Sequence, residues 1–176
     1  VLAAIDLRPI IEANPVIVEP GAIVSLRQSG HAIAAASPLP PGYLRWSGRP
    51  GELPATARGT MPYRRFAIGA SSDLLATTDV NGAIHVIDAR TMQEVLACDP
   101  LNSTGRFVAI RPQGDRIAVA SNDRRVAIVH VASGQRIVRI PLPAQVGDLR
   151  FSDDGDRLVV GLVNGRVVTL EGGGAR

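Results

Sequence analysis

The chain contains no lysine, one cysteine (Cys98) and only six aromatic residues among its 176 residues. A single cysteine has no intramolecular disulfide partner, and one thiolate is too few for a structural zinc site. No apolar run approaches the roughly 18 residues that a membrane-spanning helix needs. These absences exclude a disulfide-stapled domain and a helical membrane anchor. We expect a segment of a longer soluble protein with no membrane contact, in the cytoplasm or alternatively in the periplasm.

The residues that are abundant favour short strands over long helices. Gly and Pro number 18 and 13, and 45% of the chain is hydrophobic. With so few aromatics the core must be built from Val, Ile, Leu and Ala, interrupted often by turns. All 19 basic residues are Arg, so the pI of 9.9 overstates a formal net charge of only +3. A composition rich in Arg and Ala and free of Lys is typical of proteins from GC-rich bacterial genomes.

A sequence pattern recurs four times along the chain. A tight turn followed by a short aliphatic run begins at Ser29, Ser71, Gln113 and Asp154, at spacings of 42, 42 and 41 residues. In the second copy the pattern predicts four strands, separated by turn residues. These expected strands are residues 66–70, 74–78, 83–87 and 94–98.

The second strands read as continuous aliphatic runs, such as 117–120 and 158–161. Such runs predict sheets covered on both faces. Four-stranded sheets repeated every 40 to 45 residues are the blades of a β-propeller, so we predict an all-β propeller of four-stranded antiparallel blades. The alternative is a β-sandwich with coincidental spacing.

The best-preserved segment carries a family resemblance. Residues 81–88, Asn-Gly-Ala-Ile-His-Val-Ile-Asp, resemble the second half of a WD repeat, with Asp88 at the Asp of the Trp-Asp pair and Ile87 in place of Trp. The resemblance covers roughly residues 22–170 and is degenerate, since no Gly-His pair opens any repeat. It implies about seven blades, so we expect about four blades of a larger ring. The alternative is a ring that closes within this chain.

The repeats divide the chain. Residues 1–21 are expected to be the end of a preceding blade or closing strands, and residues 172–176 a flexible Gly-rich tail. The four WD-like repeats between them are expected at residues 22–57, 64–98, 106–141 and 147–171.

Chemistry-bearing residues do not converge in the sequence. His85 and His130 occupy non-equivalent positions on third strands, where a solvent-facing or locally bonded imidazole is more common than a zinc ligand. Residues 153–156, Asp-Asp-Gly-Asp, match no calcium loop and align with ordinary hairpin turns. Cys98 is interpreted as a small apolar filler. We therefore predict no catalytic, cofactor-binding or metal-binding residues, and no cofactor.

Arginine distribution gives the one candidate surface. In a propeller the loops joining blades and the turns between second and third strands emerge on one rim, and aspartates share these segments. The candidate partner-binding residues are Arg64, Arg65, Arg106, Arg124, Arg125 and Arg166. Only Tyr63 supplies a neighbouring aromatic, which argues against nucleic acid as the partner. A protein or peptide with acidic segments fits better, although solvated turn charges are the simpler interpretation.

The predicted function is a non-catalytic WD-repeat-like propeller segment that serves as a protein interaction or scaffold module. The alternative is part of an enzymatic or cofactor-bearing propeller, lactonase-like or dehydrogenase-like, whose site lies in blades outside this sequence. That alternative requires carboxylates, His or Arg on the channel-facing loops of successive blades, and these repeats contain no such set.

Overall fold

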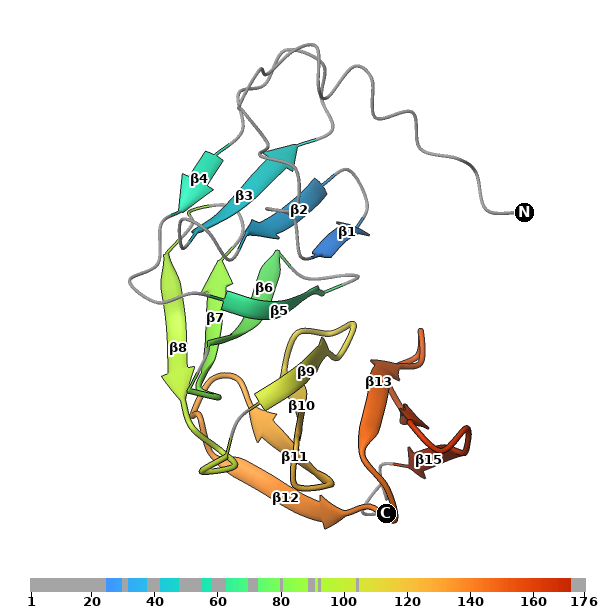
Figure 1. The fold of residues 1–176 in the computed structure, drawn as a ribbon. Helices are drawn as coiled ribbons and strands as arrows, with labels where there is room; N and C mark the ends of the chain where they lie inside the picture. The colour runs from blue at the N-terminus through green and yellow to red at the C-terminus, as the bar shows by residue number, and fades with distance from the viewer. Residues whose placement is uncertain are drawn as a thin grey trace, which may run out of the picture.

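A computed structural model gives the fold of the chain (Figure 1). It describes residues 25–29, 32–37, 42–47, 55–57, 63–69, 73–79, 81–88, 91, 93–103 and 105–171; the first four ranges and residues 63, 64, 66, 68 and 106 are described by their backbone alone. The predicted segments 1–21 and 172–176 lie outside the described residues, as do the third histidine, His31, and Arg58, which lies between the first two predicted repeats.

The described chain is all-β, with antiparallel sheets of three or four strands, and no helix in it is long and apolar enough to cross a membrane. Sheet A contains β1 (Ser25–Ser29), β2 (Ala32–Ser37), β3 (Gly42–Ser47) and β4 (Ala55–Ala57). Sheet B contains β5 (Tyr63–Ile68), β6 (Leu74–Asp79), β7 (Ile84–Asp88) and β8 (Glu94–Cys98). Sheet C contains β9 (Gly105–Ile110), β10 (Arg116–Ser121), β11 (Arg125–His130) and β12 (Arg136–Pro141). Sheet D contains β13 (Val146–Phe151), β14 (Arg157–Leu162) and β15 (Val167–Glu171).

Each sheet is a meander in which every strand pairs with the strand that follows it in the sequence. The four strands predicted for the second repeat are present. Its first strand, however, begins at Tyr63 instead of residue 66, and it contains an irregularity between Tyr63 and Arg65. The apolar pattern missed this start because backbone pairing with β6, and not hydrophobicity, places Tyr63 and Arg65 in the strand.

The sheets follow one another along an arc, with sheets A and D at its two ends (Figure 1). Contacts between successive sheets run through the first two strands: β1 and β2 contact β5, β5 and β6 contact β9, and β9 and β10 contact β13. Successive sheets therefore stack on one another by their first strands.

Two aliphatic cores fill the spaces between sheets. Ile84 and Val86 of sheet B pack with Ile117 and Val119 of sheet C, and all four are 0% exposed. A second core joins sheets C and D through residues such as Val126 and Val160. As predicted, every buried hydrophobic residue of the described core is Val, Ile, Leu or Ala.

Among the three second strands whose burial is described, coverage on both faces is confirmed for two and wrong for the other. Five of the six residues in β6 and in β10 are buried. In β14 burial alternates, and Val159 is 40% exposed. The physical reason is that sheet C covers one face of sheet D, whereas no sheet within the described residues covers the other.

Candidate partner-binding rim

The turns between second and third strands lie on one rim of the stacked sheets, which we call the arginine rim. It comprises the β6–β7, β10–β11 and β14–β15 turns and the starts of β5 and β9, which pair with the ends of β6 and β10. The turns between first and second strands form the opposite rim.

The arginine rim's first turn is organised by a buried carboxylate. Asp79, 4% exposed, accepts hydrogen bonds on Oδ1 from the backbone N–H groups of Asn81 (2.8 Å), Gly82 (2.8 Å) and Ala83 (2.9 Å). Gly82 has a φ of 98°, which a side chain would strain. This acidic group is therefore engaged by the turn and does not contribute an open negative charge to the rim.

In the β10–β11 turn, an aspartate forms an ion pair with one of the candidate arginines. Ser121 Oγ donates to Asp123 Oδ1, and Arg125 Nη1 lies 2.9 Å from Asp123 Oδ2. Arg139 Nη2 of β12 lies 3.5 Å from the same oxygen. Arg125 is thus paired within its own sheet.

Three candidate arginines keep their charge available. Arg124 and Arg166 are exposed turn residues, and neither side chain has a hydrogen bond or ion pair within the described residues. Arg65 is exposed, and its guanidinium carbon lies 5.3 Å from the centroid of the Phe107 ring. That cation–π contact orients the Arg65 head group without neutralising its charge.

The position of three arginines in strands corrects the sequence-based prediction. Arg64, Arg65 and Arg106 lie within β5 and β9 instead of in loops joining the sheets. The reason is that both first strands begin before their aliphatic residues do. The side chains of Arg64 and Arg106 lie outside the described set.

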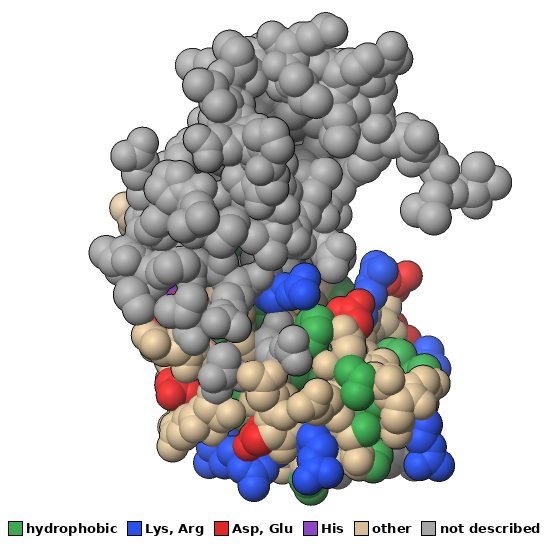
Figure 2. Space-filling view, viewed as in Figure 1, with side chains coloured by type: hydrophobic (Ala, Val, Ile, Leu, Met, Phe, Trp, Pro, Cys, Tyr) green, Lys and Arg blue, Asp and Glu red, His purple; other side chains and the backbone are tan. Residues whose placement is uncertain are grey.

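The aspartates on the segments expected to form the rim are Asp79, Asp99, Asp123 and Asp148, and the first three are engaged in hydrogen bonds. Besides Asp79 and Asp123, Asp99 accepts bonds from the backbone N–H groups of Leu101 and Asn102 on one oxygen, although it stays exposed. Asp148 is exposed in β13. Figure 2 shows arginine side chains scattered among acidic and apolar ones over the visible described surface, so positive charge is local on that surface.

The two histidines that the structure describes are locally bonded. His85 Nδ1 lies 2.6 Å from Glu94 Oε2, and His85 Nε2 lies 3.5 Å from Asp79 Oδ2. His130 Nδ1 lies 3.2 Å from Ser133 Oγ. Among the residues that the structure describes, no three side chains of His, Cys, Asp or Glu are grouped to hold a metal ion.

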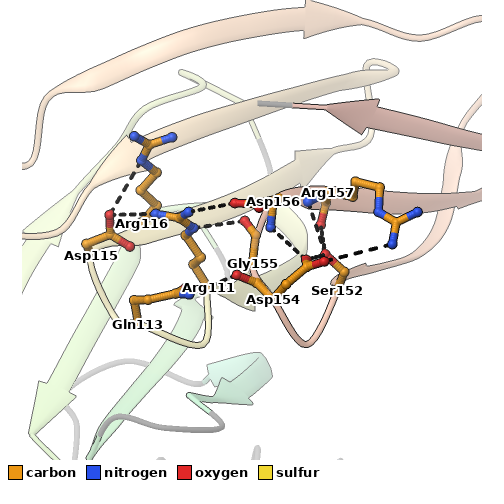
Figure 3. Close-up of polar contacts among 9 residues, drawn as sticks. All are labelled: Arg111, Gln113, Asp115, Arg116, Ser152, Asp154, Gly155, Asp156 and Arg157. Carbon is orange, nitrogen blue, oxygen red and sulfur yellow. Dashed lines mark hydrogen bonds and ion pairs between the residues drawn. The ribbon is translucent and has the colours of Figure 1, made fainter. Parts of the chain in front are cut away.

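A polar clasp on the opposite rim joins sheets C and D (Figure 3). Arg111, between β9 and β10, donates from Nε to the carbonyl oxygen of Gly155 at 2.8 Å. Its Nη1 and Nη2 lie 3.0 Å from Asp115 Oδ2 and 3.3 Å from Asp156 Oδ1. Gln113 Nε2 donates to the carbonyl oxygen of Asp154 at 2.9 Å. We call this set the Arg111 clasp.

Two features of the clasp bear on the sequence analysis. Residues 153–156 form a hairpin turn whose Asp154 carboxylate accepts from Ser152 Oγ and from the N–H of Asp156. These bonds lower the pKa of Asp154. Sequence reasoning missed Arg111, and the repeat offers no signal for it, because the equivalent positions hold Arg27, Gly69 and Ser152.

Cys98 is expected to react slowly with thiol reagents. Burial, and secondarily the charge of Asp99, raises the pKa of its thiol, so the thiolate fraction at neutral pH is small. An Asp99→Asn variant removes only the smaller cause and should react slightly faster. Reaction with a disulfide reagent across a pH series measures both rates. A fast reaction at pH 7 in the folded wild type would contradict the interpretation of Cys98 as an unreactive, small apolar residue that only fills space.

No protein-family model matches the chain, and no curated protein matches it.

Proposed function

We propose that the chain is a WD-repeat-like β-propeller segment that binds an acidic protein or peptide through its arginine rim and performs no catalysis. The propeller assignment is supported by the repeat spacing of 42, 42 and 41 residues and by the meander order of the sheets. It is further supported by the stacking of successive sheets through their first strands. Stacked sheets give a rigid frame, and the turns at their ends vary freely in sequence, which suits binding.

The observation that carries the binding proposal is that the carboxylates of the arginine rim are already bonded, whereas several of its arginines are not. The carboxylates of Asp79 and Asp123 are engaged by their own turns, whereas Arg65, Arg124 and Arg166 have no carboxylate partner within the described residues. A guanidinium group binds a carboxylate through two parallel hydrogen bonds. Acidic side chains on an extended partner therefore match this rim better than apolar or basic ones.

The test compares charge reversals on the two rims. We expect the double variant Arg124→Glu with Arg166→Glu to weaken binding of a fluorescein-labelled poly-glutamate peptide by about tenfold, measured by fluorescence anisotropy at low salt. Binding by the wild type should also weaken as salt rises, because exposed charges are screened.

The matched control is Arg157→Glu together with Arg150→Glu, which makes the same change of net charge at two other exposed arginines. Arg157 lies on the opposite rim, where its Nη2 is 3.9 Å from Asp154 Oδ2. The control should retain most of the binding. Equal losses in the two double variants would show that only overall charge matters and would refute the rim assignment.

A further inference from the structure

The dipeptide Asn-Gly occurs twice on the arginine rim, at residues 81–82 in the β6–β7 turn and at residues 164–165 in the β14–β15 turn. In both turns the glycine N–H donates to the carbonyl oxygen three residues earlier. Gly82 donates to Asp79 at 3.2 Å, and Gly165 donates to Leu162 at 3.0 Å. The two turns therefore share this dipeptide and this backbone hydrogen bond, so any difference in their chemistry comes from their surroundings.

An Asn-Gly dipeptide can lose ammonia without an enzyme, since glycine has no side chain to shield its nitrogen. The glycine nitrogen gives its proton to a solvent base and attacks Cγ of the asparagine. As the N–Cγ bond forms, the Cγ–Nδ2 bond breaks, and the leaving nitrogen takes up a proton and departs as ammonia. Water then opens the resulting succinimide ring at either carbonyl carbon and leaves aspartate or isoaspartate. The reaction consumes only water, changes no oxidation state and adds one negative charge to the chain.

The β6–β7 turn opposes this reaction at its first step. The attacking nitrogen would be that of Gly82, which is buried and donates its N–H to Asp79 Oδ1 at 2.8 Å. The carboxylate retains the proton that has to leave, and its negative charge opposes the charge that the nitrogen gains. Because a hydrogen bond to a charged group has to be broken, we expect attack on Asn81 to be slowed at least about tenfold.

The β14–β15 turn lacks this protection. Leu162 stands at the repeat position of Asp79 and has no side-chain acceptor. Asn164 and Gly165 are both exposed, and a Cβ built on Gly165 would meet no atom within 4 Å, so solvent reaches the attacking nitrogen. The backbone N–H of Arg166 donates to Asn164 Oδ1 at 3.2 Å. This donor lies at the oxygen on which negative charge develops when Cγ is attacked.

We propose that Asn164 is a deamidation site whose product lowers the charge of the arginine rim, whereas Asn81 is protected by Asp79. Arg166 is the one charged residue among residues 163–166, so a carboxylate at position 164 makes this turn neutral. A rim that binds acidic segments then binds them less tightly. This consequence for binding rests on the proposed function, whereas the deamidation itself does not.

The first test measures deamidation in the folded wild-type protein, incubated in mildly alkaline buffer, digested briefly with trypsin and followed by mass spectrometry. Cleavage after arginine gives the peptides 66–90 and 158–166, each with one asparagine and no glutamine. The mass increase of an amide-to-acid conversion is thus assigned to a single residue. We expect the peptide 158–166 to convert at least about tenfold faster than the peptide 66–90.

The matched control is the same incubation of the chain unfolded in urea. Both peptides should then convert at similar rates, because the dipeptide is identical and the contacts of the turns are lost. Equal rates in the folded protein, or faster conversion of Asn81, would overturn the proposal. A difference that persists in urea would also overturn it, because the folded turns would then not be its cause.

The second test measures binding of the fluorescein-labelled poly-glutamate peptide by the Asn164→Asp variant. We expect about threefold weaker binding than in the wild type, the size of one exposed ion pair. The control Ala132→Asp adds the same charge at an exposed position in the β11–β12 turn, at the other end of the strands, and should bind as the wild type does. Equal weakening in both variants would refute the effect on the rim. A wild type that does not bind the peptide would contradict the proposed function, and the comparison of the two tryptic peptides would still decide whether Asn164 is the deamidation site.

Discussion

The Gly155→Ala variant is expected to lose about 3 kcal/mol of unfolding free energy. Gly155 has a φ of 79°, where a side chain costs about 1–2 kcal/mol of backbone strain. The new Cβ would also lie 2.9 Å from Arg111 Nε and would overlap the Gln113 amide oxygen. Both side chains would have to move, and the hydrogen bonds of the Arg111 clasp would be lost with them.

Gly165→Ala isolates the backbone contribution. Gly165 has a φ of 82°, and a Cβ there would meet no atom within 4 Å. This control should therefore lose only the strain, about 1–2 kcal/mol. Urea unfolding of the two variants measures the difference, which is the contribution of the clasp to joining sheets C and D. Equal destabilisation would mean that the clasp rearranges without cost.

The Asp79→Ala variant is expected to lose a similar amount, about 3 kcal/mol. Its carboxylate is the acceptor for three backbone N–H groups of the β6–β7 turn, and its side chain is 6% exposed. Water therefore has little access to replace it. Donors left without an acceptor in a buried turn each cost part of their desolvation free energy.

Asp79→Asn is the control for the acceptor itself. Its amide oxygen can still accept at the Oδ1 position, so we expect a loss of about 1 kcal/mol. Thermal or urea unfolding of both variants provides the comparison. If Asp79→Asn proves as unstable as Asp79→Ala, the negative charge and not the hydrogen-bond acceptor organises the turn, and the neighbouring His85, 3.5 Å away, is the group to examine next.

Turn chemistry and strand positions inside the repeat were predictable because they are local. Val-Asn-Gly at residues 80–82 requires a glycine at positive φ, and Gly82 has one. The strand at residues 94–98 lies where the pattern predicted it. The start of β5 was less predictable, because Tyr63 and Arg65 are held there by pairing with β6 and not by their own propensity.

The candidate site was predictable only as a collection of residues. The sequence predicted that Arg124, Arg125 and Arg166 lie on turns of one rim, but it could not show which of them forms an ion pair. The structure pairs Arg125 with Asp123 and leaves Arg124 exposed at a φ of 61°. Arg65 gained an aromatic neighbour, Phe107, that lies 42 residues away in the chain. Such pairings depend on which sheets meet, which no local pattern contains.

By itself, the sequence determined the repeat, the all-β class and an aliphatic core, because the scarcity of aromatics and the spacing of turn residues act within single repeats. Only the tertiary structure decided which faces are covered. Ala118 and Val159 occupy the same repeat position, yet one is fully buried and the other is 40% exposed. The reason is physical: burial depends on the neighbouring sheet, and within the described residues sheet D covers this face of sheet C whereas no sheet covers the same face of sheet D.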